Sequence, residues 1–138
     1  MPPRYFTLDE ADQLIPRLDP LVRRLVAQRR ALRDHEAVIA EFRTVAVSGG
    51  GGMPGGRFGH ARAEAELVGS EIAEGIRLIE SWGGVVKDLD QGLVDFLSRR
   101  GDETVFLCWR LGETSIGYWH GLQEGFAGRK PLEELPPE

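Results

Sequence analysis

The chain has 138 residues, a formal net charge of −5 at neutral pH and an apolar fraction of 41%. This length suits a single domain, and the apolar fraction is sufficient for a hydrophobic core. The acidic balance argues against general binding to nucleic acid or to anionic membranes, because both require an excess of Lys and Arg.

The chain also lacks the features of membrane and secreted proteins. No apolar run approaches the roughly 20 residues needed to span a bilayer, and the N-terminus has no apolar signal-peptide core. A single cysteine, Cys108, excludes an internal disulfide and every multi-cysteine zinc site. We therefore expect a cytoplasmic protein with no membrane partner.

The first predicted element is a helical segment over residues 7–44. A capping-box sequence, T-x-x-E, begins at Thr7 and precedes a stretch with helical apolar spacing. Pro16 should interrupt or kink this opening helix, and Asp19 followed by Pro20 has the sequence of a fresh helix start. Nothing further interrupts a helix before about residue 44.

A second helix is predicted over residues 60–82. Apolar side chains recur at alternating spacings of four and three in both helices, which is the heptad pattern of coiled coils. Two consecutive helices with matching stripes should pack as an antiparallel hairpin. Further apolar side chains lie outside the stripes. Some of them should pack on the sheet, but the helices should project beyond it, and we expect two hairpins to pair there and form a homodimer. The apolar side chains outside the stripes are Leu8, Val22, Val26, Val38, Ile76 and Leu78.

A glycine-rich loop, SGGGGMPGGRFG, joins the helices over residues 48–59. Such a segment is typical of a flexible linker. A glycine-rich loop before a helix can also bind an anion, here with help from Arg57. The linker interpretation is favoured, because the loop lacks the G-K-[ST] ending of a phosphate loop and no strand precedes it.

After Gly83 the apolar period changes from helical to alternating. Short turns separate the alternating segments, so neighbouring strands should pair antiparallel in a β-meander over residues 85–120. The remaining residues, 121–138, should wrap the surface or fray. The fold class is therefore α+β, a long helical hairpin followed by a meander of three or four strands. The predicted strands cover residues 85–89, 93–98, 104–110 and 116–120.

A two-residue turn at Gly101 and Asp102 predicts that Asp95 lies opposite Cys108. The second face of the sheet then combines apolar side chains with an acid, a thiol and the guanidinium of Arg110. Such a face is either covered by the tail or a partner, or it is a site. The first face is wholly apolar and should pack on the helices, with Val94, Phe96, Val105, Leu107 and Trp109.

Several unusual strings carry a resemblance to a known family. They are the opening RYFTLDEADQLIPRL and, in the C-terminal half, VKDLDQGLVDF, LCWRLGE, WH and GFAGR. With these strings the chain resembles the bacterial family catalogued as domain of unknown function 2203. The resemblance supports the α+β fold and implies no particular reaction, cofactor or partner.

The candidate site residues are Asp95, Cys108, Arg110, Glu113 and His120. Carboxylate, thiolate and imidazole are ligands for a divalent metal. The same groups serve nucleophilic catalysis, with the cysteine attacking and the histidine as base. A lone cysteine is more often a small buried apolar residue, and the face on which the histidine lies depends on a turn of ambiguous length.

Two other groups are weaker candidates for metal binding. The string D-x-D-x-G-x-x-D, beginning at Asp88, lacks the spacing and the terminal glutamate of a calcium loop. Acids in turns more often brace the backbone. His60 and Glu64 have ligand-compatible helical spacing, with His35 across the hairpin, but ordinary polar roles explain them better.

The first helix is locally basic. Scattered arginines usually form a solvated face, and docking of an acidic protein partner is the alternative interpretation. Two functions remain open: a non-enzymatic, self-associating interaction module, or a small metal- or ligand-binding protein with its site on the meander. The sequence leaves undecided whether the second is an enzyme. The arginines of the basic first helix are Arg17, Arg23, Arg24, Arg29, Arg30 and Arg33.

Overall fold

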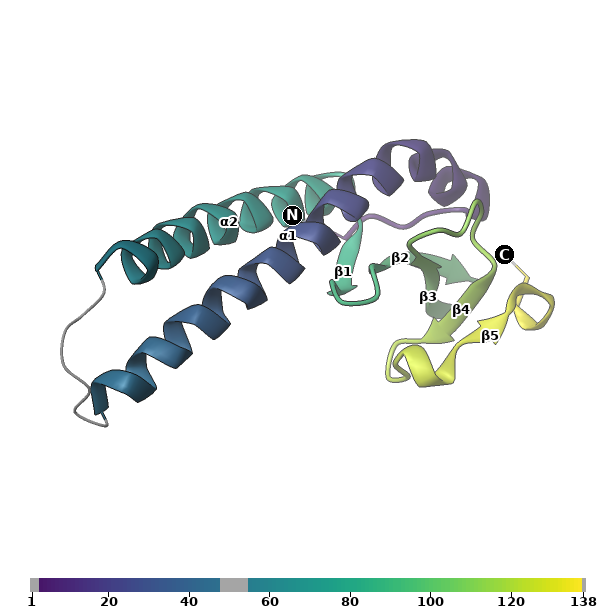
Figure 1. Ribbon diagram of the computed structural model, residues 1–138. Coiled ribbons are helices and arrows are strands. Elements are labelled where there is room, and N and C mark those ends of the chain that lie inside the picture. Colours follow the sequence, from purple (N-terminus) through teal and green to yellow (C-terminus); the bar gives the residue numbers. More distant parts are fainter. Residues whose placement is uncertain (1–2, 48–54, 138) are drawn as a thin grey trace.

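The computed structural model describes residues 3–47 and 55–137. Two long helices, α1 (Leu8–Val47) and α2 (Gly55–Ser81), lie side by side as a hairpin. A five-stranded sheet lies at one end of this hairpin, which projects well beyond it (Figure 1). The predicted α+β class is therefore confirmed. None of the described helices combines the length and apolar character needed to cross a membrane.

The start of α1 is fixed by the predicted capping box. The backbone N–H of Thr7 donates to Oε1 of Glu10 at 2.9 Å, and the N–H of Glu10 donates to Oγ1 of Thr7 at 3.2 Å. These two bonds satisfy N–H groups that the first helical turn leaves without partners. The bonds from Thr7 also hold the pKa of the Glu10 carboxyl below its usual range.

Two prolines, Pro16 and Pro20, lie inside α1, which continues through both. The expected fresh helix start at Asp19 does not occur, and this side chain instead forms an ion pair with Arg23. A proline removes one backbone hydrogen bond from a helix. Burial of neighbouring apolar side chains such as Leu18 offsets that loss, because they pack against the sheet.

The second helix begins earlier than the sequence predicts. Residues 55–59, assigned to the glycine-rich loop by the sequence, belong to the first turns of α2. The ring of Phe58 lies 5.1 Å from the ring of Phe42 in α1, and this contact stabilises the added turns. The rest of the predicted loop, residues 48–54, lies outside the described residues.

The strands follow one another in sheet order, and every neighbouring pair is antiparallel. The predicted turn joins the second and third strands, and Asp95 pairs with Cys108 as expected. The strands are β1 (Val85–Asp88), β2 (Leu93–Arg100), β3 (Glu103–Arg110), β4 (Tyr118–Gly121) and β5 (Lys130–Pro131).

The first face of the sheet forms the hydrophobic core with the two helices. Its five apolar side chains on β2 and β3 are fully buried, as the alternation predicts. The segment before α1 extends this core along β2. Phe6 stacks edge-on against Phe96 at 5.1 Å, and its backbone N–H donates to the carbonyl of Leu97.

The tail covers part of the second face. It forms a short helix (Phe126–Gly128), then β5, which pairs with β4, and a second short helix (Leu132–Glu134). The indole N–H of Trp119 donates to the carbonyl of Pro131 at 3.2 Å, which anchors β5. The start of the tail, from Glu124 to Phe126, supplies one wall of a pocket described below.

Candidate functional site

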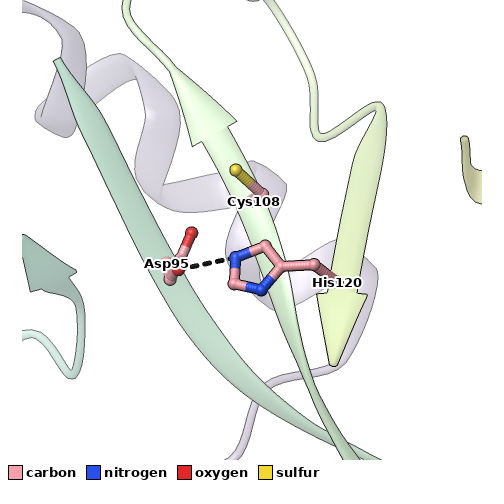
Figure 2. Close-up of side chains that lie close together, drawn as sticks. All are labelled: Asp95, Cys108 and His120. Atoms are coloured by element: carbon pink, nitrogen blue, oxygen red, sulfur yellow. Dashed lines mark hydrogen bonds and ion pairs between the residues drawn. The ribbon is translucent and has the colours of Figure 1, made fainter. Parts of the chain in front are cut away.

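Three neighbouring strands bring Asp95, Cys108 and His120 together on the second face of the sheet (Figure 2). Asp95 on β2 pairs directly with Cys108 on β3. His120 on β4 pairs with Phe106, which lies two residues before Cys108 and therefore on the same face. The strand register thus decides the question that the sequence leaves open, the face on which His120 lies.

The three side chains are buried and close enough to hold one ion. Their exposed fractions are 1% for Asp95, 1% for Cys108 and 3% for His120. One carboxylate oxygen, the thiol sulfur and one ring nitrogen all lie within 4.8 Å of one another. Such a concentration of titratable groups is costly in a protein interior unless the groups are paired or coordinate a cation.

The two ring nitrogens of His120 have different neighbours. Nδ1 lies 2.9 Å from the carbonyl oxygen of Gly121, which can only accept, so Nδ1 carries a hydrogen and donates it. Nε2 lies 2.8 Å from Oδ2 of Asp95. In a neutral imidazole with this tautomer, Nε2 presents a lone pair to a carboxylate oxygen. A proton must therefore lie between the two atoms at this distance, and a metal ion could replace it only if the two atoms moved apart.

The carboxyl group of Asp95 is incompletely satisfied. Its second oxygen, Oδ1, is buried and has no hydrogen-bond partner among the described residues. Burial raises the pKa of this carboxyl above its ordinary value, and the charge of His120 only partly opposes that effect. A buried acceptor without a partner is rare in folded proteins and suggests an additional ligand.

The thiol of Cys108 is not activated as a nucleophile. Burial, followed by the neighbouring charge of Asp95, raises its pKa to about 12. Reactive cysteines have lowered pKa values, and their base accepts the thiol proton directly. Here both ring nitrogens of His120 are directed at other groups. The geometry therefore disfavours attack by Cys108 with His120 as base, one of the two chemistries considered from the sequence.

All three side chains line a pocket of about 290 Å³ on the second face. The turn after β1 forms one wall, and the segment that follows β4 forms another. The pocket gives a small molecule or water access to the otherwise buried cluster. Its other lining residues are Lys87, Asp88, Gln91, Leu93, Glu124, Gly125 and Phe126.

The other two candidates from the sequence lie apart from this cluster. The side chain of Arg110 is exposed at the end of β3. Glu113 accepts a hydrogen bond from the backbone N–H of Arg110 at 2.7 Å and forms an ion pair with Arg129 at 2.6 Å. Glu113 thus braces the turn after β3 and anchors the tail. Neither side chain lines the pocket with Cys108.

The weaker candidates have local roles. Oδ1 of Asp88 accepts the backbone N–H of Asp90 at 2.7 Å, the turn bracing that acids commonly provide. The described ranges hold no second group of three or more acid, cysteine or histidine ligands in mutual reach. His35, His60 and Glu64 therefore do not form a metal site with one another in the hairpin.

The sequence did not identify the residues that enclose the pocket. Lys87 belongs to this set: its Nζ lies 4.5 Å from the centre of the Phe106 ring and its charge acts on Asp95. Strand alternation alone could not have placed it, because the pairing of β1 with β2 shifts register between Val86 and Asp88, where Lys87 lies. Glu124 reaches the pocket through a turn closed by its bond to the N–H of Gly121.

Comparison with known proteins identifies the family of this chain but no activity. Searches of curated proteins and of solved structures found no match. A family model described as "Uncharacterized conserved protein (DUF2203)" matches residues 4–132, nearly the whole chain. This confirms the family resemblance drawn from the sequence strings. The protein belongs to the DUF2203 family of uncharacterised conserved proteins.

Proposed function

We propose that this protein binds one divalent transition-metal ion, zinc foremost, through Asp95, Cys108 and His120. The observation that carries the proposal is the His120 ring, whose Nε2 faces a buried carboxylate while Nδ1 donates to a backbone carbonyl. Metal-binding histidines nearly always donate their second ring N–H to such an acceptor, which fixes the tautomer.

The ligand types favour zinc or a chemically similar ion. Thiolate and imidazole bind borderline and soft metals, whereas calcium and magnesium prefer sites made of oxygen. A bound ion would also satisfy Oδ1 or Oδ2 of Asp95 and would hold Cys108 as a thiolate. Tetrahedral zinc keeps nitrogen and oxygen ligands about 3.3 Å apart, so it would replace the direct bond between His120 and Asp95.

Three protein ligands leave one coordination position of tetrahedral zinc for water or a small molecule. Structural zinc sites are usually closed by four protein ligands, whereas catalytic sites keep one position open. The ligands line a pocket, which supports the open arrangement. We therefore favour a ligand-accessible metal site over a purely structural one. A thiol ligand must stay reduced, which is consistent with the cytoplasmic location expected from the sequence.

Zinc binding should release protons and should strengthen as pH rises. The pKa of Cys108 is raised to about 12, so the thiol is protonated at neutral pH and must lose its proton to bind zinc. We expect about two protons released near neutral pH, one from the Cys108 thiol and one from between Asp95 and His120, and an affinity that increases about tenfold per pH unit for each proton released. Calorimetry in buffers of different ionisation enthalpy measures the proton count.

The matched variants are Cys108→Ser and His60→Ala, the second an exposed histidine in α2. Cys108→Ser should bind zinc at least 100-fold more weakly and release no proton from this position. His60→Ala should match the wild type in both respects. Zinc binding that is independent of pH, or unchanged in Cys108→Ser, would contradict the proposal.

A further inference from the structure

One face of the helical hairpin carries a groove that the sheet does not cover. The groove has a volume of about 450 Å³ and lies between α1 and α2. Val22 and Arg33 mark the side of α1 that faces the sheet: Val22 approaches Gly92, and Arg33 pairs with Asp90. The groove residues of α1 and α2 are Arg24, Gln28, Glu71, Glu74, Gly75 and Leu78.

Helix geometry places this groove on the side opposite the sheet. Arg24 precedes Arg33 by nine residues, which is about two and a half turns at 3.6 residues per turn. The two side chains therefore point in opposite directions from α1. Figure 1 shows the same hairpin extending well past the sheet, so no element of the described chain packs beyond it at its far end.

The face around the groove exposes apolar side chains on α2. Leu78 is 44% exposed at the groove, and Leu67 is 54% exposed. Leu67, Glu71, Glu74 and Leu78 follow one another at spacings of four, three and four, so they form one stripe of α2. Large exposed leucines on a shared helical stripe are typical of a surface that another helix covers.

The two helices carry opposite charge where they lie side by side. Residues 20–33 of α1 contain five arginines and no acid, whereas residues 63–76 of α2 contain four glutamates and no base. The hydrogen bond of 2.7 Å between Gln28 and Glu71 places these segments at the same level. On the groove surface, Arg24 of α1 therefore lies beside Glu71 and Glu74 of α2.

Part of this charge has no partner among the described residues. Arg23, Arg29 and Arg33 form ion pairs, and Arg17 stacks on the Trp82 ring. Over the described residues, Arg24 makes no ion pair and neither does Glu74, although both line the groove. The sequence suggests an acidic protein partner for the arginines of α1. The acidic helix α2 of a second copy of this chain can be that partner.

We propose that this face binds a second copy of the chain, with α1 of each protomer lying on α2 of the other. A two-fold axis parallel to the hairpin produces this arrangement and places Arg24 of each protomer on Glu71 and Glu74 of the other. A two-fold axis across the hairpin would instead place α1 on α1 and α2 on α2, with the glutamates of the two α2 helices against each other. The leucine stripes are covered in the first arrangement, which forms a four-helix bundle. The proposal is independent of the metal site.

Sedimentation or light scattering at tens of micromolar tests the proposal. The expected mass is twice the 15.3 kDa of one chain. Leu78→Arg should weaken dimerisation at least tenfold without unfolding the protein, because this side chain is already exposed. Leu122→Arg is the control, since Leu122 is 47% exposed and lies outside the hairpin. A monomeric wild type would overturn the proposal and leave the groove to a different protein.

Charge reversal tests the arrangement. Arg24→Glu alone should weaken the dimer at least tenfold, and adding Glu74→Arg should restore it. Moderate salt should weaken the wild-type dimer, because ions screen charges at the surface. A dimer that is strengthened by Arg24→Glu alone, or is unaffected by both Arg24→Glu and Leu78→Arg, would overturn the arrangement. Zinc binding should be unchanged in all of these variants, which separates this result from the metal proposal.

Discussion

Zinc is expected to raise the melting temperature of the metal-free protein by about 10 °C or more. A ligand that binds only the folded state stabilises it by about 4 kcal/mol when its free concentration is a thousand times the dissociation constant. For a domain of this size, each kcal/mol shifts the melting temperature by about 3 °C. The unfolded chain cannot hold Asp95, Cys108 and His120 together, so nearly the full binding energy stabilises the fold.

Differential scanning calorimetry of the metal-free protein, with and without zinc, measures this shift. Cys108→Ser and His120→Ala should each lose most of it. Asp102→Asn, an exposed acid in the turn between β2 and β3, should retain it. A wild type that zinc does not stabilise, or a shift of equal size in the site variants and the wild type, would show that zinc binds elsewhere or not at all.

Asp95→Asn is expected to stabilise the metal-free protein at pH 8 by about 1 kcal/mol while abolishing the effect of zinc. The carboxyl is 1% exposed, and its Oδ1 lacks a described hydrogen-bond partner. Asparagine has the same shape and no charge, and its amide can donate to Nε2 of His120. Removing a strained functional group commonly stabilises a fold by this amount.

The stability gained by Asp95→Asn should increase as the pH rises. Burial raises the pKa of Asp95 in the folded state above its ordinary value near 3.8. The wild-type fold therefore loses stability progressively as the pH rises from the ordinary pKa of Asp95 through its raised pKa. The two proteins should have similar stability near pH 3, and the asparagine variant should be the more stable near neutral pH.

Denaturant unfolding in the presence of a chelator measures this difference. Asp102→Asn should change stability by less than about 0.5 kcal/mol, as surface substitutions usually do. If Asp95→Asn destabilised the metal-free fold by more than about 1 kcal/mol, the carboxylate would be a structural partner of a charged His120. The second face of the sheet would then be explained by folding alone.

Much of the fold could be predicted because local patterns determine it. The capping box at Thr7 and the two-residue turn at Gly101 each act over a few residues, and both occur as expected. Because a two-residue turn sets the register of the strands it joins, it also predicts the observed pairing of Asp95 with Cys108. Apolar alternation correctly identified the face that packs on the helices.

The third member of the cluster could not be placed in the same way. The connection from β3 to β4 is longer than a tight turn, and its course depends on distant contacts. The backbone N–H of Ile116 donates to Asp12 in α1, so the fourth strand begins at Tyr118 and not at the predicted residue 116. A shift of one residue would have put His120 on the other face.

The course of the tail could not be predicted from local sequence patterns either. Its short helices and two-residue strand have little intrinsic stability, and distant contacts hold them in place. Arg129 shows this best: it pairs with Glu113 and lies over the Tyr118 ring at 4.1 Å. These contacts join the turn after β3 to the tail, and no spacing rule in the sequence links them. The pocket wall at Glu124 to Phe126 could not be predicted for the same reason.

The most direct test of the metal site is a cobalt titration of the metal-free protein, followed by absorption spectroscopy. A thiolate bound to cobalt gives a charge-transfer band in the near ultraviolet, and four-coordinate cobalt gives intense bands in the visible. We predict both bands, saturating at one cobalt per chain and disappearing when zinc is added. Cys108→Ser should lose the charge-transfer band, and His60→Ala should keep it. Absence of the charge-transfer band in the wild-type protein, or its persistence in Cys108→Ser, would contradict the metal site built on Asp95, Cys108 and His120.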